Sequence, residues 1–223
     1  MTIFDSRGAN ASVLLAAHAG DRTLDSCFNV MLDFDSTVLP LLDVMATCKD
    51  GKRIRYEDAV SWNTLADLVD GGVSRMQTMF DEAFSYDKMR RHDPFPGASA
   101  SLVMLADLGV RLHVKTERDA RFTDDVRRYL ADHNIPYVSL RCDRPLNKVS
   151  ECTAENIHIA VDDNPQFITN ATAAGIVVRT LEYLYNRDAC RSAHITASQN
   201  WAELSIAVIE AVAQRLIAAT PGI

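Results

Sequence analysis

From residue 97 onward, short apolar runs rich in β-branched residues alternate with longer amphipathic segments. Short runs of this kind are typical of buried strands, and apolar positions repeated every three or four residues indicate helices. We expect strands at 28–32, 110–115, 136–140, 157–161 and 176–179, and helices at 98–108, 119–133, 148–155, 165–174 and 201–218. Strands that alternate with helices form a parallel sheet covered on both faces. The pattern therefore predicts an α/β protein with a Rossmann-like, doubly wound parallel sheet.

The segment 39–95 interrupts this alternation, because it contains helical patterns at 64–68 and 73–84 but no good strand. We expect a small helical cap at 39–95, inserted into a core domain formed by 27–38 and 96–223. The cap would begin directly after the first strand and lie over its carboxyl end, where it serves as a lid over a site or only as a packing subdomain. The pattern of residues 1–26 indicates no role for them.

Charge and cysteine content narrow the class of protein. A net charge of −7 argues against binding of a nucleic-acid polymer, which requires a basic face. The cysteines are odd in number and lack C-x-x-C spacing, as is typical of reduced thiols: Cys27, Cys48, Cys142, Cys152 and Cys190. The apolar stretch at 11–17 is too short for a signal peptide, and no run approaches the length of a membrane span. We expect a cytoplasmic protein without a membrane partner.

Two carboxylates, Asp33 and Asp35, follow the first predicted strand. Side chains two residues apart on an extended chain point the same way, and open α/β sheets bind ligands beyond the carboxyl ends of their strands. Such a pair can divide the work of catalysis, because one oxyanion attacks an electrophile while the other carboxyl serves the leaving group. Alone, the pair is a weak signal, since aspartates often cap turns.

Further polar residues fall at the same edge of the predicted sheet. Thr116 follows the second strand, Lys148 opens the helix before the fourth, and Asp162 and Asp163 follow the fourth. Singly, each has a structural explanation as a helix cap or a surface lysine. Together, a hydroxyl, an ammonium and up to four carboxylates around one point form a phosphate and cation site, and such carboxylates suit Mg²⁺.

These segments resemble the four motifs of haloacid dehalogenase (HAD)-superfamily phosphohydrolases, and the resemblance covers about 28–200. The matching motifs are Asp33-Phe34-Asp35-Ser36-Thr37, Thr116, Lys148 and Asp162-Asp163-Asn164-Pro165. Within the superfamily the chain is most similar to the 5′(3′)-deoxyribonucleotidase-like group, through the segments 115–118, 163–165, 185–187 and 200–204. The resemblance implies a HAD-like core with a helical cap.

The resemblance also implies catalytic and metal-binding roles for the acidic residues. Asp33 would be the nucleophile that forms an aspartyl-phosphate, and Asp35 the acid that protonates the leaving oxygen and then the base that activates water. Mg²⁺ would be held by Asp33, the backbone carbonyl of Asp35 and Asp163, with Asp162 binding directly or through water.

Thr116 and Lys148 would, by the same resemblance, bind the phosphoryl oxygens. Arg118 would either contact the substrate or form a surface ion pair with a neighbouring acid. Two residues depart from the family pattern. Ser36 stands where glycine is usual and fits a turn of positive φ less freely. Lys115 stands at a strand end where an apolar residue is usual, so that it either extends to solvent or adds charge beside the site.

The expected function is Mg²⁺-dependent hydrolysis of a small phosphomonoester, with nucleoside monophosphates as the substrates that the subgroup implies. Asp35 favours phosphoryl transfer over dehalogenation, because a halide leaves without a proton. A sugar-phosphate phosphatase, a phosphotransferase and a non-catalytic phosphate-binding protein remain alternatives. The cap aromatics could stack on a base, although their helical spacing is more typical of a core: Trp62, Phe80, Phe84 and Tyr86. The chain could be a monomer or a homodimer.

Overall fold

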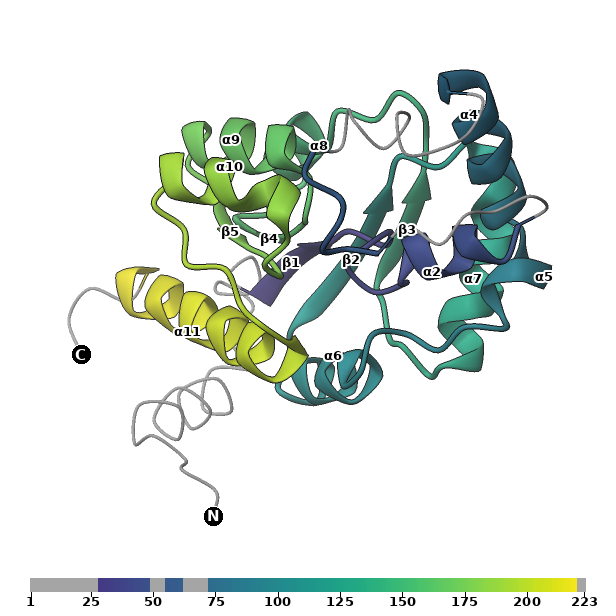
Figure 1. Ribbon diagram of the computed structural model, residues 1–223. Coiled ribbons are helices and arrows are strands. Elements are labelled where there is room, and N and C mark those ends of the chain that lie inside the picture. Colours follow the sequence, from purple (N-terminus) through teal and green to yellow (C-terminus); the bar gives the residue numbers. More distant parts are fainter. Residues whose placement is uncertain (1–27, 49–54, 62–71, 220–223) are drawn as a thin grey trace, which may run out of the picture.

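The computed structural model describes residues 28–48, 55–61 and 72–219. Its centre is a five-stranded sheet in the order β3-β2-β1-β4-β5, in which every pairing is parallel (Figure 1). The strands are β1 (Asn29–Leu32), β2 (Arg111–Thr116), β3 (Ser139–Cys142), β4 (Ile159–Val161) and β5 (Val177–Arg179). The predicted doubly wound α/β architecture is confirmed.

The order of the strands places a crevice between β1 and β4. The chain runs from β1 to β2 and β3 on one side, then returns past β1 to add β4 and β5 on the other. In register, Leu32 of β1 lies opposite Val114 of β2 and Val161 of β4. A sheet of this type binds ligands where the strand order reverses, beyond the carboxyl ends of the strands. The residues that directly follow β1 and β4 are therefore at the expected binding position.

Helices cover both faces because successive strand residues point to opposite sides. Val30 and Leu32 pack into one core with helices α6, α7 and α11, whereas Met31 packs into a second core with α8, α9 and α10. The helices of the first face are α6 (Ala98–Asp107), α7 (Thr123–Asp132) and α11 (Trp201–Ala219). Those of the second are α8 (Lys148–Ala154), α9 (Pro165–Ala173) and α10 (Arg187–Ser192). Short 3-10 turns precede α7 and α10, namely η3 (Ala120–Phe122) and η4 (Leu184–Asn186).

The described part of the insertion is helical and packs on the first core. It contains α2 (Leu41–Ala46), α4 (Gly72–Ala83) and α5 (Tyr86–Met89). Met79 and Phe80 of α4 are buried in the same cluster as the sheet residues. The predicted helix at 64–68 and Trp62 lie outside the described residues, and the proposed domain boundaries stay a prediction.

The third strand differs from its predicted position, because β3 spans Ser139–Cys142 and not 136–140. Pro136 has no N–H to donate to a ladder, and the side chain of Val138 is 54% exposed. The β-prone residues before Ser139 therefore lead into the strand without forming part of it. The other predicted strands and the long helices lie within two residues of their observed ends, except that the segment 119–133 begins with η3.

Within the described part of the chain, no helix is both long and apolar enough to span a bilayer. Cys48, Cys142, Cys152 and Cys190 are free and buried, and Cys27 lies outside the described residues.

Candidate active site

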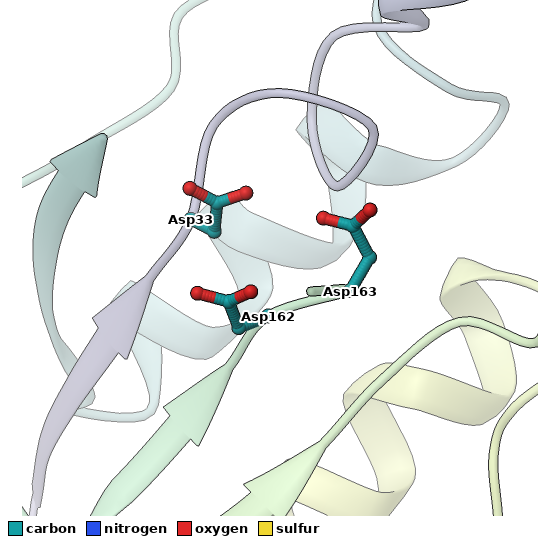
Figure 2. A group of neighbouring side chains, drawn as sticks. All are labelled: Asp33, Asp162 and Asp163. Atoms are coloured by element: carbon teal, nitrogen blue, oxygen red, sulfur yellow. The ribbon is translucent and has the colours of Figure 1, made fainter. Parts of the chain in front are cut away.

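Three buried aspartates meet in the crevice between β1 and β4. Asp33 follows β1, and its backbone N–H donates to the carbonyl of Val161 at 2.9 Å, so the sheet ladder itself fixes the start of this loop. Asp162 and Asp163 follow β4, and Figure 2 shows their carboxylates beside that of Asp33. One carboxylate oxygen from each of the three lies within 4.8 Å of the others.

Lys148 lies against two of these carboxylates. It is the first residue of α8, whose N-terminus is capped by Asn147 through a hydrogen bond from the backbone N–H of Ser150 at 3.0 Å. Its buried Nζ donates to Oδ1 of Asp33 at 2.6 Å and to Oδ2 of Asp162 at 2.8 Å. Burial alone would lower the pKa of Lys148, but the two carboxylates outweigh burial and raise it, so the side chain stays an ammonium.

Burial, together with the excess of carboxylates over the one ammonium, raises two pKa values at this site. Burial and the neighbouring Asp162 and Asp163 raise the pKa of Asp33 well above its usual range, although Lys148 opposes the shift. Burial and Asp162 raise the pKa of Asp163 to about 7. A divalent cation would compensate the excess negative charge, and carboxylate oxygens are the ligands that Mg²⁺ prefers. The donor set therefore fits such a cation, held by Asp33 and Asp163 with Asp162 beside them.

Hydroxyl groups fix the orientation of Asp163. Tyr185, in η4, donates its hydroxyl to Oδ2 of Asp163 at 2.6 Å, and Thr37 donates to Oδ1 at 3.3 Å. Nδ2 of Asn186 donates to the backbone carbonyl of Asp163 at 3.3 Å. The sequence analysis placed Thr37 in the first motif and Tyr185 and Asn186 in the subgroup segment 185–187, but it assigned none of them a contact with Asp163, because a tyrosine more than twenty positions away carries no local signal for its partner.

Two further tyrosines support the loop that follows Asp33. Ser36 has a φ of 56°, the left-handed conformation for which glycine is usual at this position. The hydroxyl of Tyr183 donates to the backbone carbonyl of Ser36 at 2.7 Å, and that of Tyr56 lies 3.2 Å from Oγ of Ser36. Tyr183 stacks on Tyr56 and on Tyr185 with ring centroids 4.9 and 5.0 Å apart. These contacts hold the serine in a conformation that it rarely adopts alone.

Asp35 lies in different surroundings from Asp33. Its Oδ2 accepts hydrogen bonds from Oγ1 of Thr116 at 3.3 Å and from Nε of Arg118 at 2.8 Å. Its Oδ1 accepts one from Nη2 of Arg118 at 2.5 Å. Arg118 is fully buried, so the ion pair with a neighbouring acid that the sequence suggested lies inside the protein and not on its surface.

A pocket of about 140 Å³ opens onto these groups. Five predicted site residues line it, whereas Asp162 and Arg118 are fully buried and contact the pocket residues Lys148 and Asp35. Among the other described residues that line it, the sequence did not single out Leu41 and Arg144. The lining consists of Asp33, Asp35, Leu41, Phe80, Phe84, Thr116, Glu117, Arg144, Lys148, Asp163 and Asn164.

Both expectations for Lys115 are wrong. Its side chain is 1% exposed, and its Nζ donates to Oε1 of Glu155 at 2.6 Å and lies 3.6 Å from Glu151. The neighbouring Thr116 lines the pocket, and Lys115 points to the opposite face of the sheet, toward α8, because adjacent strand residues alternate. The lysine therefore fastens α8, which carries Lys148, to β2.

No protein-family model and no curated protein matches the sequence, whereas solved structures do. A HAD family hydrolase from Deinococcus radiodurans, with bound phosphate and sodium, is 14% identical, with 83% of this chain and 96% of that chain covered and a TM-score of 0.58. A predicted phosphoglycolate phosphatase from Haemophilus somnus is 15% identical over 78% and 95%, with a TM-score of 0.51.

A mutant of CbbY from Rhodobacter sphaeroides, in complex with xylulose 1,5-bisphosphate, is 13% identical over 79% of this chain and 96% of that one, with a TM-score of 0.50. This chain has the HAD-like fold. At these identities the likeness extends to the fold alone. The chemistry of this chain therefore has to be argued from its own residues on the HAD-like frame.

Proposed function

We propose that this chain is a Mg²⁺-dependent phosphomonoester hydrolase in which Asp33 is the nucleophile. The observation that carries the proposal is the pocket itself, where Asp33 and Asp35 lie together with Thr116, Lys148 and Asp163 at the switch point of a HAD-like sheet. The similar structures that hold phosphate or a sugar bisphosphate support it as proteins of the same fold.

In this proposal the first half-reaction forms a bond between a carboxylate oxygen of Asp33 and phosphorus while the bond from phosphorus to the leaving oxygen breaks. Asp35 gives its proton to that oxygen. In the second half-reaction water attacks the aspartyl-phosphate, Asp35 takes the proton of the water, and inorganic phosphate and the Asp33 carboxylate are released. Both aspartates line the pocket, as these two steps require.

Lys148 and Thr116 would hold the phosphoryl oxygens during both steps. Lys148 remains an ammonium because Asp33 and Asp162 flank it, so it supplies a fixed positive charge close to the nucleophile. When bound by Asp33 and Asp163, Mg²⁺ would supply further charge neutralisation for the phosphoryl group. The backbone carbonyl of Asp35 is a proposed third ligand.

The walls of the pocket favour a small phosphomonoester, such as a phosphorylated sugar or hydroxy acid. Phe80 and Phe84 line it, but their rings stack on each other with centroids 5.6 Å apart, and each side chain is less than a tenth exposed. Phe84 also packs against Phe122 and the Arg118 guanidinium. These rings form a closed wall and not an open stacking surface for a base. Nucleoside monophosphates, which the subgroup resemblance implies, are the competing substrate class.

Phosphate release should be measured with Mg²⁺ on nucleoside monophosphates, sugar phosphates, phosphoglycolate and p-nitrophenyl phosphate. Asp33→Asn is the blank, and we expect it to lower turnover by about 10⁴-fold or more while retaining the fold. Asp107→Asn, a change at an exposed aspartate at the end of α6, is the matched control and should behave as wild type. Preference for sugar phosphates or phosphoglycolate supports the pocket argument, and preference for nucleoside monophosphates supports the subgroup. Activity that survives in Asp33→Asn contradicts the assignment of the nucleophile.

A further inference from the structure

Arg144 lines the pocket from the loop between β3 and α8, and the proposed reaction steps do not use it. Its side chain is exposed, and Nη2 donates to Oε1 of Gln77 in α4 at 3.4 Å. Gln77 and the pocket residue Phe80 are three positions apart on α4, so they lie on the same side of that helix. The guanidinium therefore reaches from its loop to the helical wall of the pocket.

The charge of Arg144 is not balanced by a carboxylate of the protein. The other cations of the site already bind carboxylates, Lys148 two of them and Arg118 one. Within the part of the chain that the structure describes, no carboxylate pairs with Arg144, whose hydrogen bond to Gln77 is long. An arginine keeps its charge at any ordinary pH and binds carboxylate or phosphate through two parallel N–H groups. The guanidinium is therefore available to an anion that enters the pocket.

Glu117 lines the same pocket and carries the opposite charge. It is exposed and forms no ion pair with Arg144, so it does not occupy the guanidinium. Solvent screens the repulsion that an exposed carboxylate exerts on an anion at a distance, whereas direct contact with a guanidinium is a charge-assisted hydrogen bond. The contact with Arg144 should therefore outweigh the repulsion by Glu117.

The two cations of the lining mark the inner and the outer end of the pocket. Lys148 is buried beside Asp33, whereas Arg144 is exposed. The volume of about 140 Å³ is close to that of a cavity that holds one benzene molecule, roughly 150 Å³. A ligand of this size has a phosphoryl group and a chain of about two or three carbons. A phosphoryl group at the inner end thus leaves the far end of a short chain beside Arg144.

We propose that Arg144 is a specificity residue that binds a second anionic group of the substrate, carried on a short chain beyond the ester oxygen. This role rests on the proposed phosphohydrolase function. Lys148 and Thr116 hold the phosphoryl group, and Arg144 holds the carboxylate or second phosphate at the other end. Phosphorylated hydroxy acids and small sugar bisphosphates have such a group. Sugar monophosphates and nucleoside monophosphates lack it.

The test compares pairs of substrates that differ in the second group alone. Phosphoglycolate and 2-hydroxyethyl phosphate have the same chain length, but only the first ends in a carboxylate. In Arg144→Met we expect kcat/KM on phosphoglycolate to fall by about 10- to 100-fold, mainly through KM, and that on 2-hydroxyethyl phosphate to change by less than about twofold. Fructose 1,6-bisphosphate with fructose 1-phosphate is the pair that replaces the carboxylate by a phosphate. The pair whose selectivity Arg144→Met abolishes identifies the second anion.

Arg144→Lys should retain part of the selectivity, because an ammonium keeps the charge but cannot bind both oxygens of the anion. Arg141→Met is the matched control. Arg141 is an exposed arginine three positions earlier that pairs with Asp143 at 3.2 Å and lies outside the pocket lining. Its loss removes the same charge from the same region, and the ratio of kcat/KM within each pair should stay as in wild type.

A binding measurement separates recognition from turnover. Phosphoglycolate is titrated calorimetrically, with Mg²⁺ present, into Asp33→Asn and into the double variant Asp33→Asn/Arg144→Met. Neither protein should hydrolyse the ligand, so the affinity is measured directly. We expect the second substitution to weaken binding of phosphoglycolate by about 10- to 100-fold and to leave binding of 2-hydroxyethyl phosphate within about twofold.

An Arg144→Met protein that unfolds at the wild-type temperature and keeps the wild-type ratio within every pair would overturn the role. An equal fall on both members of a pair would overturn it too, because Arg144 would then bind the phosphoryl group that they share. Both results leave the phosphohydrolase function standing. Wild-type protein that releases no phosphate from any substrate overturns the proposed function instead, and with it this role.

Discussion

Replacing Lys148 by methionine tests the electrostatic balance of the site independently of turnover. Methionine fills a similar volume but removes the ammonium that donates to Asp33 and Asp162 at 2.6 and 2.8 Å and balances their charge. Asp162 is fully buried and Asp33 is exposed only where it lines the pocket, so water replaces the lost partner only in part. We expect the metal-free variant to be less stable than wild type at neutral pH, by an amount that depends on pH.

The magnitude follows from the alternative open to an unpaired carboxylate, which is to take up a proton. The loss in free energy of unfolding that one unpaired carboxylate causes is then limited to about 1.4 kcal/mol for each pH unit above the ordinary aspartate pKa of about 3.9. At a pH of about 7 this limit is about 4 kcal/mol for one carboxylate, within the ~3–5 kcal/mol typical of breaking a buried ion pair. For a chain of this length, a loss equal to this limit would lower the melting temperature by roughly 8–16 °C, so the fall should not exceed that range.

The direction of the pKa shift of Asp33 decides how the stability of Lys148→Met depends on pH. Burial already raises the pKa of Asp33 in the folded state, and loss of Lys148 removes the charge that opposes this rise. A folded-state pKa above the unfolded one gives stability that is present below the unfolded pKa and lost as the pH rises. The deficit of Lys148→Met should therefore be small at a pH of about 4.5 and large at a pH of about 7.

The assay is thermal unfolding in EDTA at these two pH values, with Lys88→Met as the control. Lys88 pairs with Glu82 at 2.7 Å in a partly exposed ion pair, which should be worth about 0–1 kcal/mol at either pH. A deficit of Lys148→Met that is the same at both pH values, or no larger than that of Lys88→Met, would refute the reasoning. Added Mg²⁺ should reduce the deficit, because a cation compensates the same carboxylates.

Three further outcomes are expected. Because burial and Asp162 raise the pKa of Asp163 to about 7, the metal-free protein should lose stability as the pH rises from about 4 to about 7, and melts with Mg²⁺ should lose most of this slope. Tyr185→Phe removes the donor to Oδ2 of Asp163 and should weaken Mg²⁺ binding by about 10-fold or more in calorimetric titration; an unchanged affinity would show that Thr37 alone orients the carboxylate. Ser36→Ala should melt below Ser36→Gly, because both variants lose the Tyr56 contact but only alanine is strained at the positive φ; the reverse order would show that the turn carries no strain.

The elements that could be predicted from the sequence are those whose causes are local. Pro165 at the first turn of α9 and Asn164 as its cap, which accepts from the backbone N–H groups of Gln166 and Phe167, mark that helix start at the residue level. Alternation of strands and helices fixes the parallel sheet, and with it the edge at which Asp33, Thr116 and Asp162 meet. These positions follow from topology, so no long-range contact had to be known.

The residues that sequence reasoning misplaced depend on partners far away in the chain. Lys115 differs from a surface lysine through Glu155, 40 positions further on, and through Glu151, which let a charged side chain lie buried at a strand. Tyr185 lies 22 positions from Asp163, and Arg118 lies 83 positions from Asp35. The type of a charged or hydroxyl-bearing residue tells which hydrogen bonds it can donate. Which acceptor it contacts depends on the packing of the folded chain.

The two aspartates of the first motif show what this means for function. Two residues apart, Asp33 and Asp35 are indistinguishable in type, and both line the same pocket. Asp33 contacts an ammonium and lies beside two further carboxylates, surroundings that suit a cation and an attacking oxyanion. Asp35 contacts the Thr116 hydroxyl and the Arg118 guanidinium, which in turn donates to the backbone carbonyl of Phe84 in the insertion. In the proposed division of labour, Lys148 is the charged partner of the nucleophile Asp33, and Arg118 is the charged partner of the acid–base residue Asp35.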